Sequence, residues 1–129
     1  MSTKKIKNIA LLGHSGSGKT SFVENMLFEA KAINRIGNVE DKSTTSDYSQ
    51  IEQERGNSLF ASLMHVSWKD SKINIIDTPG LDDFVGEVIS ALKVADTAVM
   101  MLNAQSGVEV GTELIWEYVE SFKTPAMFV

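Results

Sequence analysis

Apolar and polar residues alternate in blocks along this chain, and the length of each block predicts the element that it forms. Residues 6–12 are mostly apolar over the length of a strand, which is typical of a parallel strand buried on both faces. Residues 19–32 repeat apolar side chains at helical spacing and predict a helix whose packed face is formed by Phe22, Val23, Met26, Leu27 and Ala30. The polar segment that follows, residues 34–58, is too long for an ordinary connection, so we expect it to change order with a ligand.

The pattern then returns to strands. Residues 59–68 and 73–77 are rich in apolar and β-branched side chains and flank a polar turn, which predicts an antiparallel hairpin. The second strand is broken at residues 78–80, and Asp82 or Asp83 is expected to cap a helix. The apolar stripe of that helix consists of Phe84, Val85, Val88, Ile89 and Leu92.

Two more strands and one more helix complete the pattern. The strands are predicted over residues 97–102 and 126–129, and a helix over about residues 111–122 is expected to pack through Leu114, Ile115, Tyr118, Val119 and Phe122. Because strands alternate with helices, the predicted fold class is α/β, with three layers around a mostly parallel sheet and one antiparallel edge strand from the hairpin. We interpret Met100, Met101 and Trp116 as core residues.

A glycine-rich motif, residues 13–20, lies between the first strand and the first helix and has the pattern G-x-x-x-x-G-K-T. This pattern predicts the phosphate-binding loop of a P-loop NTPase, in which backbone N–H groups and the positive end of the helix dipole surround a phosphate. Lys19 would reach the β- and γ-phosphates, and the Thr20 hydroxyl would bind Mg²⁺. An accidental match is disfavoured by the strand-loop-helix context. The predicted nucleotide-binding residues in the loop are Gly13, His14, Ser15, Gly16, Ser17, Gly18, Lys19 and Thr20.

A second motif, D-T-P-G, begins at Asp77, where the second strand of the hairpin ends. In a parallel sheet this position lies beside the phosphate loop, so Asp77 is predicted to hold Mg²⁺, usually through water. The N–H of Gly80 is predicted to meet a γ-phosphate. The motif alone is weak evidence, but together with an upstream phosphate loop it indicates a nucleoside triphosphate with Mg²⁺.

Composition narrows the class of protein. The net charge of −5 argues against a general basic surface for nucleic acid, so no sequence-specific nucleic acid is expected as a partner. The chain contains no cysteine, which rules out disulfides and thiol catalysis, and no apolar run is long enough to span a bilayer. We therefore expect a cytoplasmic protein with no membrane partner. His14 and His65 are interpreted as structural apart from the position of His14 in the loop, and Glu52, Glu54 and Glu109 as solvated surface residues.

These motifs together resemble those of elongation factor G. The matching segments are residues 13–20, Glu52-Gln53-Glu54-Arg55-Gly56, Asn74-Ile75-Ile76-Asp77-Thr78-Pro79-Gly80 with Asp83-Phe84, and Ala98-Val99-Met100-Met101 with Gly107-Val108 and Trp116. The resemblance covers nearly the whole chain, and the order of its E-R-G and D-T-P-G elements is specific to translational GTPases. It implies a G domain that binds guanine nucleotide (GTP or GDP) and Mg²⁺, and a full-length protein that acts on the ribosome in translation elongation, at translocation.

The resemblance also implies that residues 1–129 are the N-terminal part of a GTP-binding domain, without a second domain. The chain ends at Phe128-Val129, before the Asn-Lys-x-Asp element with which that family recognises guanine. Guanine specificity is therefore implied by the resemblance alone. We expect a fragment of a longer protein.

Three positions depart from the family pattern. Gly16 stands where the family usually has Asp, Ser58 where it has Thr, and Leu81 where it has His. Ser58 keeps a hydroxyl, so it is predicted as a third Mg²⁺ ligand with Thr20 and Asp77. Leu81 offers neither donor nor acceptor. We therefore predict no catalytic residue, slow hydrolysis, and a place in a divergent second branch of the elongation factor G family.

Other functions share the same motifs. A ribosomal protection or peptide-release GTPase would have the same N-terminal domain, and a nucleotide-sensing module would bind GTP and change shape with little hydrolysis. Leu81 favours the second of these alternatives. A P-loop ATPase of another lineage is disfavoured by the E-R-G and D-T-P-G pair.

Overall fold

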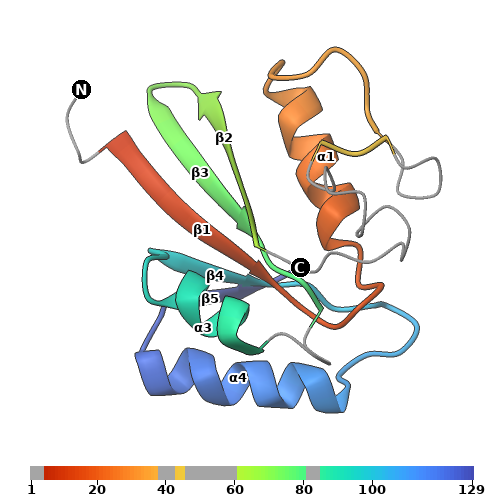
Figure 1. The fold of residues 1–129 in the computed structure, drawn as a ribbon, viewed down its shortest axis with the longest axis vertical. Helices are drawn as coiled ribbons and strands as arrows, with labels where there is room; N and C mark the ends of the chain where they lie inside the picture. The colour runs from red at the N-terminus through yellow and green to blue at the C-terminus, as the bar shows by residue number, and fades with distance from the viewer. Residues whose placement is uncertain (1–4, 38–42, 46–60, 81–84) are drawn as a thin grey trace.

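The computed structural model describes residues 5–37, 43–45, 61–80 and 85–129. Strands and helices alternate around one five-stranded sheet with the strand order β2-β3-β1-β4-β5 (Figure 1). The strands are β1 (Ile6–Leu12), β2 (Ser62–Trp68), β3 (Ser71–Asp77), β4 (Thr97–Met100) and β5 (Ala126–Phe128). The helices are α1 (Lys19–Glu29), α3 (Val85–Leu92) and α4 (Val110–Phe122).

The sheet is parallel except at one edge. Strand β1 lies in the middle and pairs in parallel with β3, where Leu11 is opposite Asp77, and with β4, where Leu12 is opposite Met100. Strand β2 pairs antiparallel with β3 through a tight turn and forms the edge of the sheet. The predicted fold class is confirmed, including the antiparallel edge strand. Because β1 and β3 are parallel neighbours, their carboxyl ends meet at the same edge of the sheet.

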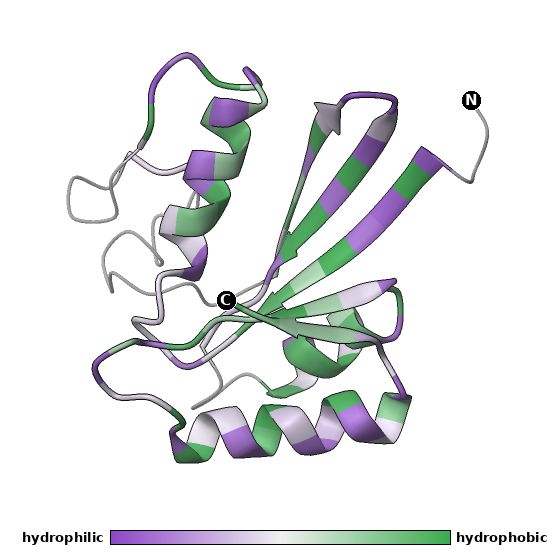
Figure 2. Ribbon diagram, turned by 180° about the vertical axis from the view of Figure 1, so that it is seen from behind, coloured by the Kyte–Doolittle hydropathy of each residue, from purple (hydrophilic) through white to green (hydrophobic). Residues whose placement is uncertain are grey.

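The helices cover both faces of the sheet, with α1 on one side and α3 and α4 on the other (Figure 1). Each face has its own apolar cluster. One joins the sheet to α1 and includes the buried residues Leu11, Val23, Leu27, Val66, Ile75, Val99 and Met101. The other joins it to α3 and α4 and includes Leu12, Val88, Leu92, Met100, Ile115 and Val119. The β1 strand turns from polar to apolar toward the phosphate loop, so its buried end positions that loop (Figure 2).

Helix α1 ends at Glu29, three residues before the predicted end. Lys31 adopts the left-handed conformation (φ 57°), which interrupts the helical hydrogen-bond ladder. The Ala32 N–H donates to the Leu27 carbonyl at 2.8 Å and closes the last turn. An apolar pattern alone cannot place such an end, because Ala30 still packs against the cluster on that face.

The predicted packing face of α4 is partly wrong. Ile115 and Val119 are buried as predicted, whereas Leu114 is 43% exposed and Phe122 is 38% exposed. The core touches a narrower stripe of the helix than the sequence pattern suggested. Hydrophobic and hydrophilic residues alternate along α4 (Figure 2). Asp82, Asp83 and Phe84, the predicted start of α3, lie outside the described residues. None of the helices in the described part of the chain is long and apolar enough to cross a membrane.

Candidate nucleotide-binding site

The glycine-rich motif forms the loop between β1 and α1. Lys19, the first residue of α1, is 7% exposed, and its Nζ donates to the carbonyl oxygens of Gly13 and His14, both at 2.9 Å. The Ser17 N–H donates to the His14 carbonyl at 3.2 Å and tightens the turn. The ammonium group of Lys19 therefore lies across the loop, close to where a phosphate-binding loop holds the β- and γ-phosphates.

The first turn of α1 suits an anion. The residue that precedes the helix is Gly18, with φ 89°. As a glycine it has no side chain that could cap the N–H groups of the first turn. No acidic side chain lies in the first turn, so the positive end of the helix dipole is not compensated by a charge of its own. The free backbone N–H groups at the N-terminus of a helix are a common binding site for phosphate. The loop thus fits the phosphates of a nucleotide.

Two oxygen groups meet beside this helix start. The Thr20 hydroxyl, in the first turn of α1, donates to Asp77 Oδ2 at the end of β3 at 3.2 Å. Asp77 is 2% exposed, and the next residue, Thr78, donates its hydroxyl to the Leu11 carbonyl at 2.6 Å, which holds the end of β3 against β1. A hydroxyl and a carboxylate are ligands that Mg²⁺ prefers, usually with water and phosphate oxygens completing the shell. The donor set therefore fits Mg²⁺, which Thr20 and Asp77 would hold.

Gly80 brings the D-T-P-G motif against the phosphate loop. A Cβ atom at Gly80 would lie 2.8 Å from both the Cα and the backbone nitrogen of Ser15. The two backbones thus touch, and only glycine allows this approach. The structure therefore brings together Gly80, Asp77 and the phosphate loop, as the sequence predicted, although their roles in binding stay predictions.

His14 makes a contact that the sequence analysis missed. Its Nδ1 lies 2.8 Å from the Ser15 carbonyl and 3.2 Å from Oε2 of Glu109, the residue that precedes α4. Since both partners only accept hydrogen bonds, Nδ1 carries the proton. Glu109, interpreted as a solvated surface residue, keeps 32% of its side chain exposed, and its carboxylate also links the start of α4 to the phosphate loop. At the start of α4 the Glu109 N–H also donates to Oγ1 of Thr112 at 3.4 Å. No pattern in the sequence indicates the contact with His14, because the two residues lie far apart in the chain.

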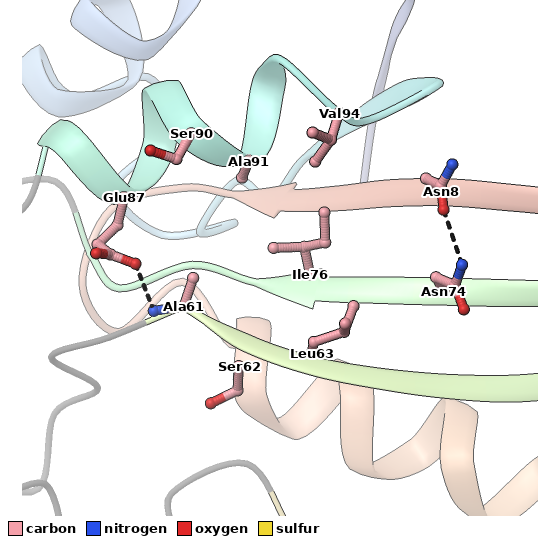
Figure 3. Close-up of a pocket in the computed structure, with 10 residues that line it drawn as sticks. All are labelled: Asn8, Ala61, Ser62, Leu63, Asn74, Ile76, Glu87, Ser90, Ala91 and Val94. Atoms are coloured by element: carbon pink, nitrogen blue, oxygen red, sulfur yellow. Dashed lines mark hydrogen bonds between the residues drawn. The ribbon is translucent and has the colours of Figure 1, made fainter.

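A pocket of about 360 Å³ lies between α3 and the β1-β3-β2 part of the sheet, and its lining includes no residue of the phosphate loop (Figure 3). Its floor includes Leu63 and Ile76. At one end the Ala61 N–H donates to Glu87 Oε2 at 2.9 Å, and at the other Asn74 donates to Asn8 at 2.8 Å. Glu87 thus joins α3, which follows the D-T-P-G motif, to the residue just before β2.

The remaining predicted site residues cannot be placed. Ser58 and Leu81 lie outside the described residues, as do Glu52, Glu54, Arg55 and Gly56. Within the described part of the chain no three His, Asp or Glu side chains are grouped as a metal site.

Comparison with known protein families matches residues 4–129 to the elongation factor Tu GTP binding domain. The chain belongs to this family. The family match explains why a phosphate loop and a D-T-P-G motif meet at one edge of the sheet. It confirms the predicted relationship to the elongation-factor GTPases and identifies the chain as a translational GTPase G domain.

Two fungal relatives are named ribosome-releasing factor 2, mitochondrial. The protein from Lodderomyces elongisporus is 43% identical over 123 residues, and the one from Candida dubliniensis is 43% identical over 121 residues. The matches cover 95% and 94% of this chain, but the chain spans only 15% of the length of each relative. The relatives thus support the family of this domain, and the comparison does not extend to the rest of their own length.

Solved structures have the same fold. The crystal structure of a Thermus thermophilus protein, ttk003000868, superposes with a TM-score of 0.92 at 36% identity, over 96% of this chain and 19% of that one. A bacterial selenocysteine-specific elongation factor, EF-Sec, gives a TM-score of 0.74 at 20% identity, again over 96% of this chain and 19% of the other. The second likeness concerns the fold alone.

Proposed function

We propose that this chain binds GTP or GDP with Mg²⁺ as the N-terminal part of a GTP-binding domain, and that the full-length protein acts on the ribosome. The observation that supports the proposal best is the Thr20 to Asp77 hydrogen bond, because it joins the phosphate loop to the D-T-P-G motif at 3.2 Å. Lys19 would balance the charge of the β- and γ-phosphates, and the Gly80 N–H would contact the γ-phosphate. When bound, Mg²⁺ neutralises charge on the phosphate oxygens. Ser58 is proposed as a further ligand of the ion.

The step on the ribosome has two candidates. The resemblance to elongation factor G favours translocation, whereas the names of the two fungal relatives favour release of ribosomes. Assays of translocation and of ribosome release with the full-length protein and GTP distinguish the two. We predict the cytoplasm as compartment; the word mitochondrial in the relatives' names makes the organelle the alternative, which cell fractionation decides.

Replacement of Lys19 tests nucleotide binding itself. Lys19→Ala removes the ammonium that bonds the Gly13 and His14 carbonyls, so the triphosphate loses its main counter-charge in the loop. Loss of one such buried charged contact is expected to lower GTP affinity by about 10²-fold or more. The measurement is titration of the full-length protein with a fluorescent GTP analogue, with and without Mg²⁺. Unchanged affinity in the variant would refute the assignment of the site.

A further inference from the structure

One side chain of α1 contacts two separate stretches of the long connection between α1 and β2. Glu24 is fully buried, with 0% of its surface exposed. Its Oε2 accepts the N–H of Gly37 at 2.8 Å, and its Oε1 accepts the N–H of Thr45. Both oxygens of one carboxylate therefore hold the backbone of a single connection at points eight residues apart. We call Glu24, Gly37 and Thr45 the α1 clamp.

Glu24 is a carboxylate in a position where an apolar residue would be expected. The residue lies between Val23 and Leu27, which belong to the apolar cluster beneath α1. Removing a carboxylate from water is unfavourable unless hydrogen bonds replace its hydration. A leucine here would pack without that penalty, but it would accept no hydrogen bond. Glu24 thus attaches two backbone N–H groups, those of Gly37 and Thr45, to α1, which an apolar residue could not do.

The connection is folded back on itself where the clamp holds it. A Cβ atom at Gly37 would overlap the carbonyl group of Ser43 and would lie 2.7 Å from the Cα of Thr44. The chain therefore passes itself at backbone contact distance, which only glycine permits. Thr44 is buried at this crossing. Gly37 and residues 43–45 are consequently packed against each other, and Glu24 holds them from the side of α1.

The α1 clamp lies next to the proposed Mg²⁺ ligands. Residues four apart in a helix share a face, so Glu24 lies one turn along α1 from Thr20. The Thr20 hydroxyl is bonded to Asp77. The same connection also contains Ser58, for which the sequence predicts a contact with Mg²⁺. The clamp therefore attaches this connection to the helix beside the ion that its later part is predicted to contact.

We propose that Glu24 is a positioning residue for recognition of the triphosphate, an inference that rests on the proposed function. A connection whose base is already attached loses less conformational freedom when it binds the γ-phosphate and Mg²⁺. A diphosphate makes its contacts with the phosphate loop, residues 13–20, whereas the two carboxylate oxygens of Glu24 accept the N–H groups of Gly37 and Thr45. Glu24 therefore strengthens binding of GTP more than binding of GDP.

Paired titrations of the full-length protein test this selectivity. Affinities for GDP and for a non-hydrolysable GTP analogue, both with Mg²⁺, are compared in wild type, Glu24→Gln and Gly37→Ala. Gln keeps the size of the side chain but can accept only one of the two N–H groups through its single carbonyl oxygen. We expect the affinity for the GTP analogue to fall about tenfold, with GDP affinity changed by less than about twofold. Glu29→Gln is the matched control, because Glu29 is an exposed glutamate of the same helix.

Hydrogen exchange supplies a second measurement that does not depend on affinity. The amides of Gly37 and Thr45 should be protected in the GDP-bound wild type and exchange faster in Glu24→Gln, but not in Glu29→Gln. Equal losses of GDP and GTP affinity would overturn the proposal and leave Glu24 a structural residue. If Glu24→Gln does not fold, Gly37→Ala decides, because it alters the same connection without changing α1. A wild type that binds neither nucleotide would instead refute the proposed function.

Discussion

At the edge of the sheet where β1 and β3 end, the candidate site combines a cation, a carboxylate and a hydroxyl. Lys19 supplies the cation, Asp77 supplies the buried carboxylate, and the hydroxyl of Thr20 lies 3.2 Å from Asp77 Oδ2. Gly16 differs from these three, because it offers no side chain and has φ 78°. No atom lies within 4 Å of a Cβ built on it, so this position is open. A side chain can thus be added there to test how the loop acts on the nucleotide.

We predict slow GTP hydrolysis by the full-length protein, because Leu81 cannot orient water. Leu81→His, alone and with Gly16→Asp, should raise the single-turnover rate on ribosomes by about 10²–10⁴-fold, the usual contribution of one such polar group. At position 16 an added side chain meets no neighbouring atom within 4 Å, although the φ of 78° strains any residue other than glycine; Asp tolerates a positive φ better than most residues. The measurement is single-turnover hydrolysis of labelled GTP.

The control for this prediction is the affinity of the single variant Leu81→His for GTP, which should stay unchanged because Lys19, Thr20 and Asp77 are retained. A wild-type rate equal to that of an ordinary elongation factor G would contradict the prediction. It would mean that another residue positions the water. His14 would be the nearest candidate, although its Nδ1 is already bonded to Ser15 and paired with Glu109.

Among the helices, α1 and α3 each hold the connection between α1 and β2 with a glutamate. Glu24 of α1 accepts N–H groups at Gly37 and Thr45, whereas Glu87 of α3 accepts the N–H of Ala61, where the connection joins β2. Helix α1 begins at the phosphate loop, and α3 follows the D-T-P-G motif. Both ends of the connection are therefore attached to elements that extend from the candidate site.

Removal of the second attachment should loosen the start of β2. In Glu87→Ala the Ala61 N–H loses its acceptor, while Glu87→Gln keeps a carbonyl oxygen that can accept it (Figure 3). We expect exchange of the Ala61 amide to accelerate about tenfold or more in the alanine variant, as for the loss of one hydrogen bond to a charged group. Hydrogen exchange measured by NMR checks this. Equal acceleration in both variants would show that the hydrogen bond is not the cause.

Over the whole molecule, two apolar clusters on opposite faces of one sheet stabilise the fold. Adjacent residues of β1 supply both, since Leu11 packs toward α1 and Leu12 toward α3 and α4. The central strand thus fixes the loop between two packed layers, which keeps the candidate site rigid at its base.

The cluster beneath α4 gives a direct test of this arrangement. Ile115 is 0% exposed and its neighbour Leu114 is 43% exposed, so the two differ in burial on one helix. Ile115→Ala should lower the free energy of unfolding by about 2–5 kcal/mol, the usual cost of emptying a core site. Leu114→Ala should cost less than about 1 kcal/mol. Urea unfolding followed by circular dichroism measures both, and similar losses would contradict the observed packing.

Much of the fold was predictable because its signals are local. The blocks of apolar residues predicted the five strands, the antiparallel edge and the helices α1, α3 and α4. The ends of elements were less predictable, as at α1, where Lys31 turns left-handed although Ala30 still packs. Exposure of Leu114 and Phe122 was missed for a related reason, since apolar spacing does not show how wide a stripe the core covers.

The amino-acid order by itself determined the phosphate loop, the D-T-P-G motif and their meeting. Each motif is contiguous, and parallel β1 and β3 necessarily end at the same edge. Only the tertiary structure decided the contacts of Glu24 with Gly37 and Thr45 and of His14 with Glu109. Those contacts join groups that lie far apart in the chain and whose residue types are ordinary on a surface. The packing of the helices decides the direction of these two carboxylates, and therefore which groups they contact.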